Sequence, residues 1–203
     1  MSKLPANNKP MDFSDIKKNL KEDLTKKRYK HTIGVTYTAA AMAMRYEYDI
    51  DKAMLAGYLH DCAKCYEDDV NIKLITNAGM EVNRYEYANP QLLHAKAGMV
   101  LAQYKYNIED DDILHAILVH TTGCENMNLL DKIIFIADFI EPGRYVQPHL
   151  TELRHLAFTD IDQCLLHILQ DTIEYLDESD KIIDPTTRQT YDYYAKRVTL
   201  LPY

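Results

Sequence analysis

The chain has 203 residues, of which 47% are apolar and 27% are charged, a composition typical of a globular domain. Its net charge of −8 argues against non-specific nucleic-acid binding, which needs a basic surface. No apolar run approaches the roughly 20 residues that a bilayer-spanning helix requires. Residues 1–10 contain no apolar signal segment, so we expect a cytoplasmic protein without membrane partners.

Helical patterns run through nearly the whole chain. Apolar periodicity, capping residues and turn signals predict helices over these ranges: 30–48 (apolar periodicity), 52–62 (capped by Asp51), 68–78, 90–101, 109–120, 129–139 and 161–176, with a shorter one after Pro185. Strand-like alternation, internal repeats and a Gly/Ser/Pro-rich linker are all lacking from the sequence. The pattern therefore predicts one all-α domain with frayed ends.

Four cysteines are present, and we expect them to be reduced thiols in a chain of this kind: Cys62, Cys65, Cys124 and Cys164. Cys62 and Cys65 form a C-x-x-C pair, but neither a second pair nor a thioredoxin-like βαβ pattern accompanies it. We interpret them as small apolar side chains around His60, and a redox pair is the less favoured alternative.

The adjacent pair His60-Asp61 is the most informative feature of the sequence. On a helix, neighbouring side chains point about 100° apart, so an imidazole and a carboxylate can both reach a cation lying between them. The second oxygen of Asp61 can bridge to another ion. Four further potential ligands lie elsewhere in the chain: His31, His94, His120 and Asp138. Together these residues predict a hydrolytic site with one or two metal ions.

Asp138 stands out because it lies in the apolar segment 133–139. A buried carboxylate without a partner is costly, so it needs a metal ion, an Arg or hydrogen-bond donors. A buried salt bridge or a cap is the alternative to a metal ligand. The remaining histidines have no distinctive context, and we interpret them as surface or core residues: His115, His149, His155 and His167.

Four segments, in this order, resemble the YqeK-type family of bacterial symmetrical bis(5'-nucleosyl)-tetraphosphatases, which belongs to the HD-domain metal-dependent phosphohydrolases. They are RYKHTIGV (28–35), LAGYLHDCAK (55–64), HTTG (120–123) and LDKIIFIADFIEPGR (130–144). The resemblance runs from about residue 17 to 195, leaving an N-terminal extension (1–16) and a C-terminal tail (196–203). It implies a single HD-domain helical bundle.

The resemblance also implies hydrolysis of diadenosine tetraphosphate, a small nucleotide, into two molecules of ADP at a centre of two iron ions. One ion would be held by His31, His60, Asp61 and Asp138. The other would be held by Asp61, His94 and His120, with Asp61 bridging. The imidazole and carboxylate donors by themselves leave Mn, Zn and Ni open as well as Fe.

Asp61 and Lys64 are the expected catalytic residues, with Lys64 one helical turn from His60 and on the same face. A surface lysine is the alternative for Lys64. Residues expected to bind the phosphates are Arg28, Lys64, Thr121, Gly123 (through its N–H) and Arg144. Competing hypotheses are an HD hydrolase acting on a nucleoside monophosphate or a guanosine alarmone, and a helical scaffold without metal. Surface tyrosines are compatible with a homodimer.

Overall fold

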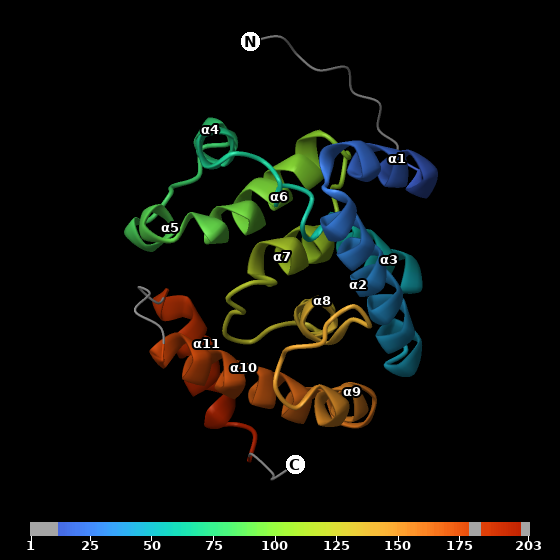
Figure 1. Cartoon of the computed structure of the whole chain (residues 1–203), viewed down its shortest axis with the longest axis vertical. Coiled ribbons are helices and arrows are strands. Elements are labelled where there is room, and N and C mark those ends of the chain that lie inside the picture. The colour runs from blue at the N-terminus through green and yellow to red at the C-terminus, as the bar shows by residue number, and fades with distance from the viewer. Residues whose placement is uncertain (1–11, 179–183, 200–203) are drawn as a thin grey trace.

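The computed structural model describes residues 12–178 and 184–199, which form helices joined by loops without any β-strand (Figure 1). The all-α prediction is confirmed. The helices are α1 (Phe13–Asp23), α2 (Lys26–Arg45), α3 (Ile50–Leu59), α4 (Asp68–Asn77), α5 (Arg84–Ala88), the 3₁₀ turn η1 (Pro90–Leu92), α6 (Leu93–Tyr104), α7 (Asp111–Val119), α8 (Leu129–Ile140), α9 (Leu150–Thr159), α10 (Ile161–Asp177) and α11 (Pro185–Ala195).

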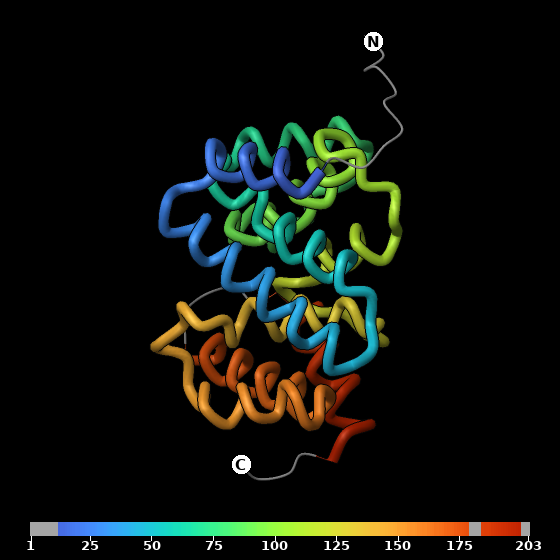
Figure 2. Tube along the Cα trace, turned by 90° about the vertical axis from the view of Figure 1, so that its right-hand side faces the viewer, coloured from blue at the N-terminus to red at the C-terminus, as the bar shows by residue number. Residues whose placement is uncertain are grey.

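Helix α8 lies between two groups of helices (Figures 1 and 2). It packs against α2, α3 and α7 on one side and against α9 and α10 on the other. Its sequence, LLDKIIFIADFI, is apolar around most of its circumference, as expected of a helix covered from several directions. This central position brings the carboxylate of Asp138 toward the other predicted ligands.

Helix α3 differs from its predicted boundaries at both ends. Asp49, not Asp51, is the N-cap, and its carboxylate accepts a hydrogen bond from the Lys52 N–H at 3.0 Å. The helix ends at Leu59, so His60 and Asp61 lie in the turns beyond it and not within a helix as predicted.

The early end of α3 has a local cause. The Nδ1–H of His60 donates to the Gly57 carbonyl at 2.8 Å, and tighter turns follow, with the Cys62 N–H bonded to the Leu59 carbonyl. The Lys64 N–H is bonded in the same way to the Asp61 carbonyl. Lys64 is therefore not one α-helical turn from His60, and its position is decided by other contacts.

Three helices were not predicted from the sequence: α1, α5 and α9. In α1, Ile16 and Leu20 are fully buried. Residues 12–16 of the expected extension thus include the start of a packed helix, whereas residues 1–11 lie outside the described residues. Residues 200–203 of the expected tail also lie outside them. Within the described ranges, no helix combines the length and apolarity needed to cross a bilayer.

Candidate metal centre

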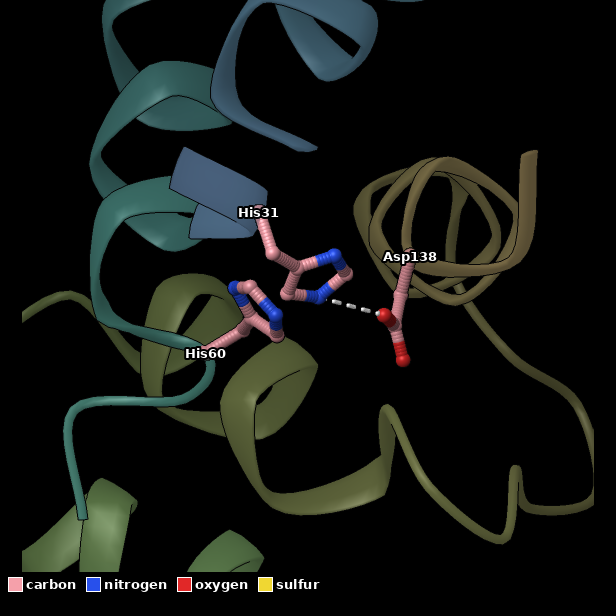
Figure 3. A group of neighbouring side chains, drawn as sticks. All are labelled: His31, His60 and Asp138. Atoms are coloured by element: carbon pink, nitrogen blue, oxygen red, sulfur yellow. Dashed lines mark ion pairs between the residues drawn. The ribbon is translucent and has the colours of Figure 1, made fainter. Parts of the chain in front are cut away.

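The six predicted ligands converge from five parts of the chain. They come from α2 (His31), the turn after α3 (His60 and Asp61), the start of α6 (His94), the end of α7 (His120) and α8 (Asp138). Four of them are buried, with at most 4% of the residue exposed: His60, Asp61, His94 and His120. Figure 3 shows three side chains of the centre pointing toward one another, from α2, the end of α3 and α8.

The ligand atoms form two groups of three. Those of His31, His60 and Asp138 lie within 4.8 Å of one another, as do those of Asp61, His94 and His120.

Asp61 faces both groups, one oxygen to each. Its Oδ2 lies 3.3 Å from His60 Nε2 and 3.6 Å from His31 Nε2. Its Oδ1 lies 3.2 Å from His94 Nε2 and 3.8 Å from His120 Nε2. The two lone-pair-bearing oxygens of one carboxylate thus join the two groups.

Three of the four histidines are oriented by main-chain carbonyls. His60, His94 and His120 each direct Nδ1 at a carbonyl three residues earlier, at Gly57, Gln91 and Ile117 respectively. A carbonyl only accepts hydrogen bonds, so in each ring the proton is assigned to Nδ1. The other nitrogen, Nε2, is then left with a lone pair that points into the centre.

The inward nitrogens face one another or a carboxylate. His31 Nε2 and His60 Nε2 are buried and make no hydrogen bond, and His31 Nε2 faces Asp138 Oδ1 at 3.0 Å. His94 Nε2 and His120 Nε2 face each other at 3.1 Å. Neutral acceptors gathered at such distances are unfavourable in a buried site unless a cation lies among them. The donor set therefore suits a divalent metal ion.

Electrostatics favour the metal-binding form of His94, His120 and Asp61. Burial disfavours the charged imidazolium, and the pKa of His94 falls to about 3 and that of His120 to about 4. Burial alone would raise the pKa of the Asp61 carboxyl, but His60, His94 and Arg28 hold it well below its usual range. At neutral pH His94 and His120 are thus neutral imidazoles and Asp61 is an ionised carboxylate, the forms that metal binding requires. Burial by itself would lower the pKa of His60, but the charges of Asp61 and Asp138 raise it.

Comparison with known proteins places this geometry in a family. The HD domain matches residues 28–143. The symmetrical bis(5'-nucleosyl)-tetraphosphatase of Bacillus subtilis is 38% identical over 174 residues, covering 86% of this chain and 92% of that protein. The Halalkalibacterium halodurans protein of the same name is 39% identical, covering 85% and 91%. This chain belongs to the HD-domain family of symmetrical bis(5'-nucleosyl)-tetraphosphatases.

A solved structure shares the fold of this HD-domain protein. It is the crystal structure of a Clostridium acetobutylicum protein described as a predicted HD superfamily hydrolase involved in NAD metabolism. The sequences are 39% identical, the TM-score is 0.90, and the match covers 94% of this chain and all of the other. The HD-domain resemblance seen in the sequence is therefore confirmed.

Two arginines form ion pairs with the carboxylates of the metal centre. Arg28 Nη1 is 2.7 Å from Asp61 Oδ2, and Arg144 Nη2 is 2.7 Å from Asp138 Oδ1. Arg144 also donates from Nε to the Asp138 carbonyl at 3.0 Å. The Asp138 side chain is 25% exposed. Burial by itself would raise the pKa of this carboxyl, but its neighbours, His31, His60 and Arg144, hold the pKa below the usual range. The ion pair with Arg144 offsets the cost of the carboxylate in an apolar helix.

Lys64 lies behind His94 rather than on the His60 face. Its Nζ is 3.4 Å from the Gln91 carbonyl and 3.1 Å from His94 Nδ1. Burial lowers the pKa of this ammonium group. The expected proximity of Lys64 to the ligands is present, although the helical spacing used to predict it is not.

Thr121 and Gly123 differ in what they offer. The Thr121 hydroxyl lies 3.4 Å from His94 Nε2 and 3.3 Å from His120 Nε2. The Gly123 N–H, in contrast, donates to the Val119 carbonyl at 2.8 Å. It is already used in closing α7, which corrects the expected role of this N–H as a phosphate donor. Gly123 has a φ of +66°, a value that glycine adopts without strain.

Sequence reasoning missed Glu141, the first residue after α8. Its side chain is only 5% exposed, and its Oε1 lies 3.0 Å from His31 Nδ1. The sequence contained one signal for it, because an acidic residue at a helix C-terminus is unfavourable to the helix dipole. In the sequence this residue marked only the end of a helix.

A second His/Asp grouping, termed here the outer cluster, consists of His115, Cys124 and Asp131. The Nδ1 of His115 lies 3.0 Å from Asp131 Oδ1, and the His115 side chain is 45% exposed. Asp131 is fully buried and also accepts the Asn128 N–H at 2.8 Å, as part of the capping box that starts α8. These partners account for the imidazole and the carboxylate without a metal ion.

Proposed function

We propose that this chain is a metal-dependent hydrolase that cleaves diadenosine tetraphosphate symmetrically into two molecules of ADP. The observation that carries the proposal is Asp61, whose two oxygens face two separate groups of inward-pointing donors. The substrate is supported by the relatives from Bacillus subtilis and Halalkalibacterium halodurans, whose names specify a symmetrical bis(5'-nucleosyl)-tetraphosphatase and which match this chain over most of its length.

The proposed centre holds two ions. His31, His60, Asp61 and Asp138 are the ligands of one, and Asp61, His94 and His120 are those of the other. Iron is the proposed metal, and the same donors suit Mn, Zn and Ni. When bound, such ions neutralise phosphate charge and lower the pKa of water.

The protein's own cations complete the site for a polyphosphate. Arg28 and Arg144 each have 29% of the side chain exposed, so their guanidinium groups are accessible at the edge of the centre. Lys64 adds a third positive charge next to His94. This local charge explains how a chain with a net charge of −8 would attract an anionic nucleotide.

Each residue then has a defined role in the reaction. Asp61 holds the two ligand groups together, and Arg28 and Arg144 bind phosphoryl oxygens and orient the chain of phosphates. Lys64 stabilises charge that develops during transfer, which depends mainly on positioning and electrostatics. The Thr121 hydroxyl, next to two inward nitrogens, is placed to bind a phosphoryl oxygen. Gly123 is left out because its N–H is engaged.

The deciding experiment is an anaerobic assay of the purified, iron-loaded protein with diadenosine tetraphosphate, with the products separated by chromatography. ADP as the sole product, lost in the Asp61→Ala variant, is the expected result. AMP plus ATP would keep the metal centre and overturn the cleavage position. No turnover by the metal-bound protein would overturn the substrate. A cytoplasmic location and a homodimer stay predictions, to be checked by fractionation and by light scattering.

A further inference from the structure

Among the four predicted ligand histidines of the described residues, only His31 has no main-chain carbonyl as its Nδ1 partner. His60 and His120 follow the C-termini of α3 and α7, where carbonyls of the last turn are free to accept the ring Nδ1–H. His94 lies at the start of α6 and faces the Gln91 carbonyl of the preceding turn η1. His31 lies inside α2, whose carbonyls are occupied by the helical hydrogen bonds. Its Nδ1 partner has to come from elsewhere, and it is the Glu141 carboxylate at 3.0 Å.

Glu141 is held firmly in this position. Its Oε1 faces His31, and its Oε2 accepts the N–H of Gly143 in the turn that follows α8. The main chain around it is anchored as well, because Arg154 donates to the Glu141 carbonyl at 3.0 Å and to the Ile140 carbonyl at 2.9 Å. The Glu141 carboxylate is thus held by an anchored main chain and by two hydrogen-bond donors, the His31 ring and the Gly143 N–H.

The surroundings leave space for this carboxylate and for little else. A Cβ added at Gly34, one turn along α2 from His31, would overlap Glu141 Oε2. A Cβ added at Gly143 would lie 2.9 Å from both carboxylate oxygens, closer than real Cβ atoms approach. Two glycines on separate elements therefore make room for the Glu141 side chain.

We propose that Glu141 is a positioning residue for the metal centre: it fixes the His31 ring and keeps its proton on Nδ1, so that Nε2 faces Asp61 and Asp138. Such a carboxylate also makes the imidazole a better donor, and loss of an outer partner of this kind typically weakens metal binding about 10- to 100-fold. This inference rests on the proposed metal centre. It adds to that centre a residue that is not itself a ligand.

The first test replaces Glu141 with Gln, which keeps the size of the side chain. A carboxylate accepts at both oxygens, whereas an amide accepts at one end only, so it cannot serve both His31 and Gly143. Mn²⁺ affinity, measured by EPR of the free ion, is expected to fall about 10- to 100-fold. Glu152→Gln makes the same charge change at an exposed site on α9 and is expected to bind Mn²⁺ as the wild type does.

A second variant disturbs the contact between His31 and Glu141 without changing the charge of the protein. Gly34→Ala displaces the carboxylate sterically while favouring the helix, and should weaken Mn²⁺ binding to a similar degree. Gly98→Ala is its matched control, since an added Cβ there meets its nearest atom at 3.4 Å. Wild-type affinity in both Glu141→Gln and Gly34→Ala would overturn the inference while leaving the centre intact.

The His31 tautomer gives a readout that needs no metal. Nitrogen NMR of the metal-free wild type should show the proton on His31 Nδ1, with a mixture of tautomers in Glu141→Gln and in Gly34→Ala. General destabilisation would not select this one ring, so the measurement separates positioning from folding. An unchanged His31 tautomer in both variants would contradict the role of Glu141. Absence of Mn²⁺ binding by the wild type would contradict the metal centre itself.

Discussion

The metal centre and the outer cluster are built from the same residue types but arranged in opposite ways. In the outer cluster, His115 turns its Nδ1 to Asp131, and imidazole and carboxylate satisfy each other. In the metal centre, His60 turns its Nδ1 outward to a carbonyl and leaves a buried Nε2 without a hydrogen bond. A set of metal ligands is therefore distinguished by the direction of the free lone pairs on its imidazoles, and not by the spatial proximity of His and Asp.

The metal centre and the outer cluster also differ in burial. His60 is fully buried, whereas 45% of the His115 side chain is exposed. Water can solvate His115 whatever its charge, whereas the buried nitrogens that face one another within the centre suit a shared cation. This difference leads to four predictions, in order of decreasing effect.

The largest effect is expected for ligand removal. Asp61→Ala removes the carboxylate that joins both groups, so metal content and hydrolytic activity should both fall by more than about 100-fold, beyond the loss typical of an outer partner. His115→Ala in the outer cluster should leave both unchanged. Metal analysis and the nucleotide assay check the pair. Loss of metal in His115→Ala would show that the outer cluster also takes part in metal binding.

Metal removal should change the free energy of unfolding only through the residues of the metal centre. At a free-metal concentration 100 times the dissociation constant, binding stabilises the folded state by about 2.7 kcal/mol. Thermal unfolding with and without chelator should show this gain in the wild type and in His115→Ala. The gain should be absent in His60→Ala. An equal gain in all three proteins would place the bound metal outside the centre.

Acidification should destabilise the metal-free protein through His94 and His120, whereas His60, with its raised pKa, acts in the opposite sense. The folded-state pKa values of His94 and His120, about 3 and about 4, lie below the unfolded value of about 6.5. The unfolded chain therefore binds more protons, so stability is fully present above pH about 6.5 and falls as the pH drops toward 4. At pH 5.5 each of these two histidines should lower the free energy of unfolding by about 1.4 kcal/mol.

Urea titrations of the chelator-treated protein at several pH values measure this effect. A free energy of unfolding that stays constant from pH 7 to 5.5 would show that these imidazoles are not held neutral by burial. Bound metal should shift the onset of destabilisation to lower pH, because ligation competes with protonation.

The smallest effect belongs to the outer cluster. Asp131→Asn keeps the size of the side chain but removes one acceptor of the Asn128 and His115 hydrogen bonds, so unfolding should become easier by about 1 kcal/mol. Metal content should not change. Urea unfolding together with metal analysis checks both statements, and loss of metal on this substitution would show that Asp131 takes part in ion binding.

The sequence carried the identities of the groups that converge. Helical periodicity predicted an all-α chain, and the conflict between Asp138 and its apolar neighbours marked that residue before any fold was known. Such signals are local, because they depend on residue type and on spacing along one helix. They did not show where α3 ends, since the His60 side chain itself diverts the Gly57 carbonyl.

Side-chain directions and partners came from the packing of helices that are distant in sequence. The contact between His31 and Glu141 joins residues 110 positions apart, and Gly34 is explained by that carboxylate alone. Likewise, the sequence left the Gly123 N–H available for a phosphate, but in the folded chain this N–H donates to the Val119 carbonyl. Which ring nitrogen is free depends on what lies on the other side of the ring, and only the assembled helices place a partner there.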